Sequence, residues 1–252
     1  MALLYSAQCI VVTDRFTYTD DSQISKWYFK RKNDPSNKVV WTGQHVLLTT
    51  PVEYGRVGAL YLRLNLTQFD KWQVDFIYFM SNSTDPYPAY GLSLNFYRNP
   101  HIGATGEGIG YSGVPGYAVE CDTYVFNPGD PPIPTSLLPR PMHATTSISL
   151  VEGLNLRNRW MYTRVIFTAL GRNSTHVYGR LQVVVWDGAD KQTLKPLGNV
   201  LVNSSYTGWF KIYGNYLGFS AATGGQRDAH ALWWARIETC TAPVGGVVRS
   251  PA

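Results

Sequence analysis

Gly58-Ala59-Leu60-Tyr61-Leu62-Arg63-Leu64-Asn65-Leu66 is the stretch that decides the fold. From position 60 onward every even-numbered residue in it is leucine, and the leucines alternate with residues of mixed character. Side chains of an extended chain point alternately to its two faces, so this period of two predicts a strand with one apolar face. Such a strand must pack its leucines against a core.

Similar runs of β-branched and aromatic residues recur along the chain between Gly, Pro, Asn and Asp breaks. No ten-residue window has the apolar stripe of a helix. Besides the run ending at Asp122, the predicted strands are 10–18, 38–50, 58–66, 69–80, 92–97, 144–150, 160–169, 180–186, 209–212, 217–221 and 231–240. Residues 99–116, with six glycines from Gly103 to Gly116, and 126–141, with six prolines, are predicted as long loops.

About twelve strands and two long loops predict an all-β fold, a two-sheet antiparallel jelly-roll β-sandwich. At 252 residues the chain could hold one large all-β domain or two smaller ones. We assign residues 1–240 to a single domain and residues 241–252 to a C-terminal tail or linker. The composition of the full chain, with 14% aromatic residues, 23 glycines and 15% charged residues, suits short strands joined by turns.

Val119-Glu120-Cys121-Asp122-Thr123-Tyr124 places two carboxylates, Glu120 and Asp122, on one face of a strand. Such a pair needs a divalent cation, a shared proton or full solvation to relieve its repulsion. Downstream, Asn127 and Asp130 add oxygen ligands and His143 adds an imidazole. These residues favour a metal site, with a solvated acidic turn as the alternative.

Several motifs in this chain occur in the same order in the L-type (legume-like) lectins, and together they cover residues 58–237. They are Phe69-Asp70, Tyr90-Gly91-Leu92, the glycine run 106–110, Glu120-Cys121-Asp122-Thr123-Tyr124 with its downstream ligands, and Leu217-Gly218-Phe219-Ser220-Ala221-Ala222-Thr223-Gly224. The sequence thus resembles this family, which implies the concanavalin A-like lectin fold and a non-catalytic protein that binds carbohydrate.

The resemblance also implies which residues do the binding. A transition metal, usually manganese (Mn2+), would take Glu120, Asp122, Asp130 and His143. Calcium (Ca2+) would take Asp122, Asp130, Asn127 and the backbone carbonyl of Tyr124, an all-oxygen set. The metals would hold the loop so that Asn127 donates to a sugar, beside an aromatic face. The implied carbohydrate-binding residues are Tyr90, Gly91, Gly110, Tyr124, Phe126, Asn127, Gly225 and Gln226.

Two positions depart from the family pattern. Tyr90 stands where the family has an aspartate that anchors the sugar, and a tyrosine hydroxyl lacks the two charged acceptors of a carboxylate. Asp85 and Asp228 are candidate substitutes, each against the alternative of an ordinary solvated loop residue. The segment 133–142 lengthens the loop before His143, so His101 and His230 compete with His143 as the imidazole ligand.

Two other classes of function remain open. A glycoside hydrolase of the same architecture uses a Glu-x-Asp-x-Glu strand, but the third position here is Tyr124, which is a poor proton donor. This residue favours a binder over an enzyme. The other class is a structural or adhesion module of a surface or virus particle that has the fold without binding sugar, and Tyr90 favours it.

Charge, hydropathy and cysteine positions bear on nucleic-acid binding, membrane insertion and disulfide formation. The formal charge of +5 comes with no nucleic-acid-binding motif, and no apolar run reaches the roughly 20 residues that span a bilayer. Cys9 and Cys240 lie in the first and last strands, which predicts a disulfide, with two buried thiols as the alternative. Cys121 is predicted to be a buried small hydrophobe.

Four Asn-x-Ser/Thr sequons, at Asn65, Asn82, Asn173 and Asn203, are typical of an exported glycoprotein. We therefore expect a secreted or cell-surface (extracellular) protein whose partners are glycans or glycoproteins rather than nucleic acid. A homodimer formed through an edge of the back sheet is an assembly that the sequence leaves open.

Overall fold

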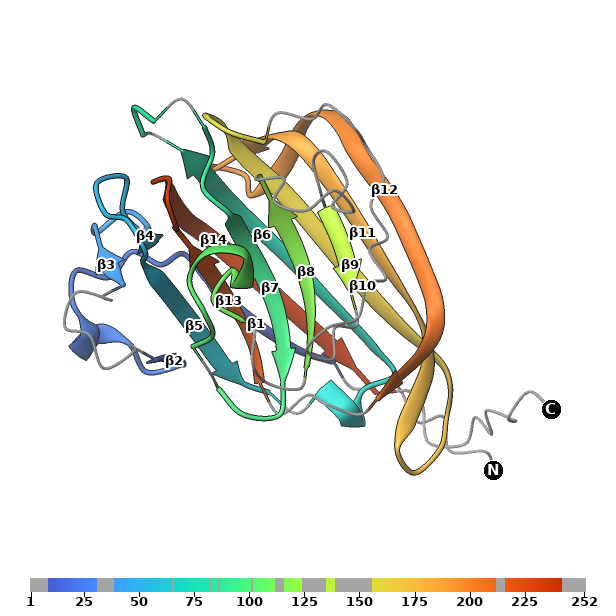
Figure 1. Cartoon of the computed structure of the whole chain (residues 1–252). Coiled ribbons are helices and arrows are strands. Elements are labelled where there is room, and N and C mark those ends of the chain that lie inside the picture. Colours follow the sequence, from blue (N-terminus) through green and yellow to red (C-terminus); the bar gives the residue numbers. More distant parts are fainter. Residues whose placement is uncertain are drawn as a thin grey trace, which may run out of the picture.

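Two β-sheets packed face to face make up the structure (Figure 1). A computed structural model describes residues 9–30, 39–64, 66–81, 83–85, 87–100, 102–111, 116–123, 135–138, 156–211 and 216–241. All strand pairs in this part of the chain are antiparallel. The two-sheet antiparallel sandwich predicted from the alternation is therefore confirmed.

The larger sheet has eight strands, and β1 (Cys9–Asp14) joins it by pairing with β14. The order of the others is β12 (Lys195–Lys211), β11 (His176–Asp190), β10 (Trp160–Arg172), β6 (Lys71–Ser81), β14 (Ala229–Cys240), β4 (Val46–Thr49) and β3 (Val40–Trp41). Strands distant in sequence thus lie side by side, as a jelly roll requires.

The smaller sheet has six strands, in the order β2 (Trp27–Lys30), β5 (Val57–Arg63), β13 (Tyr216–Ala222), β7 (Gly91–Tyr97), β8 (Gly116–Asp122) and β9 (Thr135–Leu138). Three short 3-10 helices lie in the connections: η1 (Asp21–Gln23), η2 (Leu66–Gln68) and η3 (Gly106–Gly108). Among the described residues no helix is long and apolar enough to cross a membrane.

Aromatic rings from both sheets meet in the core between them. Phe76 of the larger sheet lies 5.1 Å from Phe219 of the smaller one, and Trp72 lies 4.7 Å from Phe96, measured between ring centroids. Leu60 and Leu62 of the opening alternation also belong to this core. The apolar face predicted for that strand is therefore the face between the sheets.

The opposite face of the same strand is also buried, which its sequence did not predict. Ala59 and Tyr61 belong to a second cluster with Tyr97, Ile109 and Tyr111. Ile109 and Tyr111 come from the glycine-rich loop, which folds over the outer face of the six-stranded sheet (Figure 1). This loop therefore gives the smaller sheet a covered outer face.

Some strand boundaries differ from the prediction. The run 38–50 is divided into β3 and β4, which pair as a hairpin. The strand predicted from position 10 ends at Asp14, whose side chain accepts a hydrogen bond from the Phe16 N–H at 2.8 Å. The strand predicted to 66 ends at Arg63, before η2.

Strand β2 was not predicted, and β12 was predicted only at its end, where the strand expected at 209–212 overlaps it. Strand β12 lies at the edge of its sheet and has few buried side chains, so most of its sequence lacks apolar periodicity. Strand β2 contains only four residues, and its Trp27 side chain packs in the core. The prediction of an unbroken loop over 126–141 was wrong at β9, whose four residues lie between Pro134 and Pro139 and pair with β8.

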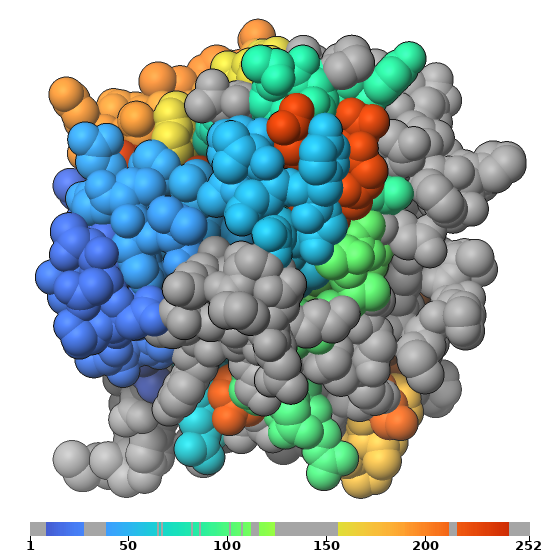
Figure 2. All heavy atoms as spheres, turned by 60° about the vertical axis from the view of Figure 1, so that its left-hand side comes forward, coloured from blue at the N-terminus to red at the C-terminus, as the bar shows by residue number. Residues whose placement is uncertain are grey.

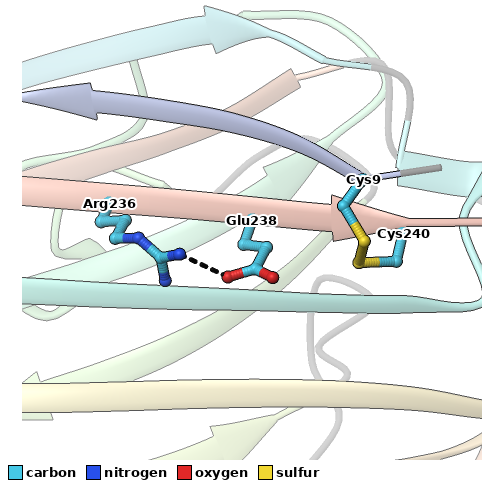
Figure 3. The surroundings of a disulfide bond; sticks show 4 residues. All are labelled: Cys9, Arg236, Glu238 and Cys240. Atoms are coloured by element: carbon cyan, nitrogen blue, oxygen red, sulfur yellow. Dashed lines mark hydrogen bonds and ion pairs between the residues drawn. A yellow bond between two sulfur atoms is a disulfide. The ribbon is translucent and has the colours of Figure 1, made fainter. Parts of the chain in front are cut away.

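Cys9 and Cys240 form the predicted disulfide, which joins β1 to the end of β14 (Figure 3). The two cysteines face each other in the antiparallel register, with their Cα atoms 4.1 Å apart. Cys121 is a buried thiol on the core side of β8, and burial raises its pKa to about 12. A thiol in that state is no nucleophile at neutral pH.

Candidate functional site

Two carboxylates point outward from the six-stranded sheet, beneath the glycine-rich loop. Val119 and Cys121 of β8 belong to the core, so Glu120 and Asp122 project from the opposite face. Glu120 is only 2% exposed, whereas Asp122 is half-buried. The strand alternation therefore places the pair on one face, as expected from the sequence.

A row of polar side chains continues from Glu120 across the sheet. In the register, Glu120 lies beside Ser93 of β7, and Ser93 lies beside Ser220 of β13. The Asn95 amide donates to the Ser220 hydroxyl at 2.8 Å, and the two serine oxygens lie 2.9 Å apart. These side chains are buried, so a row of polar groups lies on the outer face of this sheet and is shielded from solvent.

The glycine-rich loop seals this row from above. Tyr111 donates a short hydrogen bond to the Glu120 carboxylate, and Tyr97 donates to the Tyr111 carbonyl at 2.7 Å. The Ser220 hydroxyl in turn donates to the carbonyl of Ile109 at 2.7 Å. The loop is therefore held by side chains of the sheet on which it rests.

Gly110 is required where the loop touches the sheet. Its φ is +73°, and a Cβ atom there would come within 2.7 Å of Val57 Cγ1. Its N–H donates to the Ala104 carbonyl, and its own carbonyl accepts from Gly103. A glycine satisfies both the backbone angle and the close approach.

Tyr90 lies with its ring between two glycines of neighbouring loops. A Cβ atom on Gly224 would lie 2.4 Å from Tyr90 Cε2, and one on Gly106 would lie 3.5 Å from the same atom. The Tyr90 ring is half-buried and packs against the cluster beneath the glycine-rich loop. Here the ring serves as a spacer between loops.

The backbone at Tyr90 is bound to the end of β8. The Thr123 N–H donates to the Tyr90 carbonyl at 3.1 Å, and the Thr123 hydroxyl donates to the Ala89 carbonyl at 2.7 Å. Gly91 follows with a φ of +121°, and a Cβ atom there would lie 2.2 Å from the Cys121 carbonyl oxygen. This contact couples the Tyr90 loop to the strand that carries both carboxylates.

Neither candidate substitute for the missing aspartate is an ordinary solvated residue. Asp228 is fully buried and accepts from Arg157 Nη2 at 2.7 Å and from the Ala89 N–H at 2.9 Å. Asp85 accepts three hydrogen bonds from Arg227. Asp228 therefore organises the backbone before Tyr90, and Asp85 organises the loop that follows β13.

Gly225 is exposed and Gln226 is half-buried in that loop, where the Gly224 N–H donates to the Gln226 carbonyl at 3.3 Å. The loop is bonded to its neighbours through Gly55 N–H to Gly224 O at 3.1 Å and Gly106 N–H to Thr223 O at 3.2 Å. Figure 2 shows segment 50–56 (cyan) next to segment 224–228 (red) at the surface. Several loops thus meet around Tyr90.

His230 is a core residue. It is fully buried, and burial lowers its pKa to about 3. Thr49 donates its hydroxyl proton to the Asp228 carbonyl, so it accepts from His230 Nδ1 at 2.5 Å. His230 is therefore not the competing metal ligand that its residue type had suggested, because it is buried and its Nδ1 is bonded to Thr49.

The remaining predicted residues lie outside the described part of the chain. These are Tyr124, Phe126, Asn127, Asp130, His143 and the competing His101. Of the predicted metal ligands, Glu120 and Asp122 are described, and they suit a hard cation because both offer carboxylate oxygens on one face. Tyr111 occupies one acceptor site of Glu120, and a carboxylate has about four.

Sequence reasoning missed the polar row and the Asp85–Arg227 pair. Ser93 and Asn95 alternate with Leu92, Leu94 and Phe96, so two polar residues on one face of an apolar strand were a readable signal. Asp85 and Arg227 are separated by more than a hundred residues, and no local pattern connects them.

The fold is that of the L-type lectins. The structure is similar to peanut lectin, solved with a nine-residue peptide, at 17% identity and a TM-score of 0.66, covering 93% of this chain and 99% of the other. It is similar to the basic winged bean lectin, solved with Tn-antigen, at 17% identity and a TM-score of 0.61, covering 93% and 100%.

A third similar structure is the exoplasmic/lumenal domain of VIP36 in its Ca2+- and mannose-bound form. Its identity is 18% and its TM-score is 0.61, with 90% of this chain and 88% of the other covered. No family profile and no curated sequence matches this chain. The resemblance seen in the sequence motifs is therefore confirmed at the level of the fold.

Proposed function

We propose that this protein binds carbohydrate without altering it, through a loop site ordered by calcium and manganese or another divalent transition metal. The observation that carries the proposal is the buried Glu120 beside Asp122, on the outer face of a sheet and beneath a sealed loop. A buried carboxylate next to a second one is costly unless hydrogen bonds or a cation stabilise both. The lectin fold supports the same function.

In this proposal Glu120, Asp122, Tyr124, Asn127, Asp130 and His143 hold the metals. The sugar contacts Tyr90, Gly91, Gly110, Tyr124, Phe126, Asn127, Gly225 and Gln226. The metals would supply positive charge that neutralises the carboxylates and fixes the loop after β8. The residues of the chain then orient the sugar, and a preformed loop lowers the entropy cost of binding.

Glycan-array binding with and without EDTA tests the proposal. We expect binding in calcium and manganese that is lost on chelation and lost in Glu120→Gln. Glu238→Gln is the matched control, because Glu238 is a half-buried carboxylate on the larger sheet, paired with Arg236 at 2.6 Å. Binding that survives both EDTA and Glu120→Gln would contradict the metal-ordered site.

The proposal includes the absence of catalysis, because the strand position where a hydrolase carries its acid holds Tyr124. A panel of β-glucans incubated with the protein checks this. No release of reducing sugar is expected, and turnover that disappears in Glu120→Gln would show a hydrolase instead.

A second candidate is an adhesion or structural module that has the fold without sugar binding. The position of Tyr90 favours it, because the ring packs between Gly106 and Gly224 where the family has an anchoring carboxylate. The same array decides, since an adhesion module binds no glycan in either calcium or EDTA.

We place the protein outside the cell, secreted or on a surface, with glycans or glycoproteins as partners. The Cys9–Cys240 disulfide supports this, because such bonds persist in oxidising compartments. Mass spectrometry of protein from a secreting eukaryotic host tests the sequons, of which Asn173 is exposed between β10 and β11. Dimerisation through a back-sheet edge stays a proposal that light scattering can test.

A further inference from the structure

Exposed apolar side chains gather in the loops around the candidate site. Val52 and Tyr54, in the loop between β4 and β5, are 70% and 54% exposed, and Tyr87, just before Tyr90, is 64% exposed. The loop carrying Val52 and Tyr54 lies outside the set of residues proposed above for sugar and metal. Its exposed aromatic ring needs an explanation of its own.

Tyr54 is not a loosely held side chain. The guanidinium carbon of Arg227 lies 4.6 Å from the centre of the Tyr54 ring, so a cation covers one face of that ring. Since more than half of the Tyr54 surface is exposed, the other face is open to solvent. The result is an aromatic plane with one supported face and one free face.

Asp85 holds the arginine in place. Its Oδ1 accepts from Arg227 Nη2 at 2.6 Å, and its Oδ2 accepts from Nε at 3.1 Å and from the backbone N–H at 2.9 Å. These hydrogen bonds from Arg227 hold the pKa of Asp85 below its usual range, so the carboxylate is ionised at neutral pH. A bidentate pair of this kind fixes the plane of the guanidinium.

The charges of this surface cancel in pairs. Arg227 is bound to Asp85, and Arg56 lies 3.3 Å from Glu53 in the same loop as Tyr54. Asp85 occupies the Nε–Nη2 edge of the Arg227 guanidinium, one of the two edges through which an arginine binds a carboxylate or sulfate by parallel bonds. The surface therefore suits a neutral ligand with an apolar face.

We propose that Tyr54, supported by Arg227 and Asp85, is a second sugar subsite that stacks on a residue of a neutral oligosaccharide beyond the residue bound at Tyr90. This inference rests on the proposed carbohydrate binding and adds a substrate class, a neutral oligosaccharide rather than a monosaccharide. The pyranose ring offers a face of C–H bonds, and the free face of Tyr54 matches it in shape and polarity.

Backbone bonds connect this subsite to the first one. The Gly55 N–H donates to the Gly224 carbonyl, and Gly224 lies against the Tyr90 ring. The Thr223 N–H also donates to the Arg56 carbonyl at 2.9 Å. Tyr54 and Tyr90 are thus placed by the same short hydrogen-bonded loops, which suits a ligand that touches both.

Calorimetric titration with two ligands tests the proposal, using the neutral oligosaccharide that binds best on a glycan array and its terminal monosaccharide. Tyr54→Ala is expected to weaken oligosaccharide binding about five- to tenfold, the worth of one aromatic stacking contact, and to change monosaccharide binding less than twofold. Tyr54→Phe should retain both affinities. Arg227→Lys should weaken the oligosaccharide more than the monosaccharide, because it removes the bidentate support of Tyr54, while the loop that carries Gly225 and Gln226 also depends on this arginine.

Val52→Ala is the matched control in the same loop and should change neither affinity. Thermal unfolding of each variant confirms that the fold is kept. If glycans bind and Tyr54→Ala leaves the oligosaccharide affinity unchanged, this inference is wrong and the proposed function stands. If sialylated oligosaccharides bind more tightly than their neutral counterparts, the neutral class is wrong. If the array shows no binding, both proposals fail together.

Discussion

The outer face of each sheet carries a buried carboxylate, and the two carboxylates differ in the groups that surround them. On the larger sheet, Asp75 is 2% exposed and accepts from Arg164 Nε at 2.6 Å, Tyr162 Oη at 2.9 Å and Gln73 Nε2 at 2.6 Å. On the smaller sheet, Glu120 is equally buried, beside a second carboxylate and under a tyrosine hydroxyl.

The difference lies in what surrounds each acid. Acids and bases alternate along the face of Asp75, in a set completed by Arg164, Arg236 and Glu238. An apolar row crosses the sheet next to it and consists of Trp186, Tyr162, Ile77 and Trp234. That face contains its own counter-ions, and it contributes to stability. The face of Glu120 carries two carboxylates with a loop packed over it, and the proposed binding site rests on this difference.

Removing the disulfide should have the largest effect on this comparison. Cys240 lies on the same side of β14 as Arg236 and Glu238, at the end of the ion-pair row (Figure 3). The bond closes a loop with a sequence separation of 231, so the double variant Cys9→Ser/Cys240→Ser should lose about 5 kcal/mol at most from the free energy of unfolding.

Urea denaturation measures this loss, with the reduced wild type as the control. We expect the metal-dependent stabilisation to survive in the double variant, because the disulfide belongs to the larger sheet. Loss of that stabilisation together with the disulfide would show that the two faces are not independent.

Glu120→Gln should distinguish the two faces most clearly, because only the face of Glu120 is expected to make stability depend on metal. With manganese at about a hundredfold excess over its dissociation constant, the wild type should gain about 3 kcal/mol of stability over its EDTA form. The variant should lose that gain and match the wild type in EDTA to within about 1 kcal/mol. Thermal unfolding in both buffers is the measurement, and an unchanged manganese shift would remove Glu120 from the metal site.

Asp75→Asn should destabilise the protein by about 2 kcal/mol in calcium and in EDTA alike. The change removes the carboxylate that pairs with Arg164 at 2.6 Å and the more distant of the two carboxylates beside Arg236. Because both arginine side chains are 35% exposed, water offsets part of the cost. Glu238→Gln, at a more exposed pair, should cost less than about 1 kcal/mol. A calcium-dependent effect of Asp75→Asn would contradict the purely structural role of the larger face.

Acid should destabilise the folded protein through His230, which is buried between the two sheets. Its pKa in the folded protein is about 3, below the unfolded value near 6.5, so the unfolded state binds the extra proton as pH falls between these values. Stability is fully present above about pH 6.5 and falls by up to about 1.4 kcal/mol per pH unit from this residue alone.

Urea denaturation from pH 7 to pH 4 measures the slope, and His230→Gln should make it shallower while leaving the carboxylate contributions in place. An identical slope in wild type and variant would show that His230 is protonated in the folded state.

Much of the fold followed from local pattern. The alternation of residues 58–66 and the common face of Glu120 and Asp122 were predicted, since strand periodicity depends only on neighbours two residues apart. The Cys9–Cys240 pairing was predicted because the first and last strands of a sandwich commonly lie side by side. Most of strand β12 was not predicted because an exposed edge strand buries little, and β9 was not predicted because prolines enclose it. For the site, the strand that carries the carboxylates was predicted and the packing of the loops was not.

By itself the sequence determined which residues face outward from each strand, because the side-chain alternation of an extended chain is a property of the backbone. Only the tertiary structure decided that Tyr111 caps Glu120, that Tyr90 lies between Gly106 and Gly224, and that Arg227 joins Asp85 to Tyr54. Most of these contacts join loops more than a hundred residues apart in the chain. Their geometry depends on how the two sheets bring those loops to one end of the sandwich.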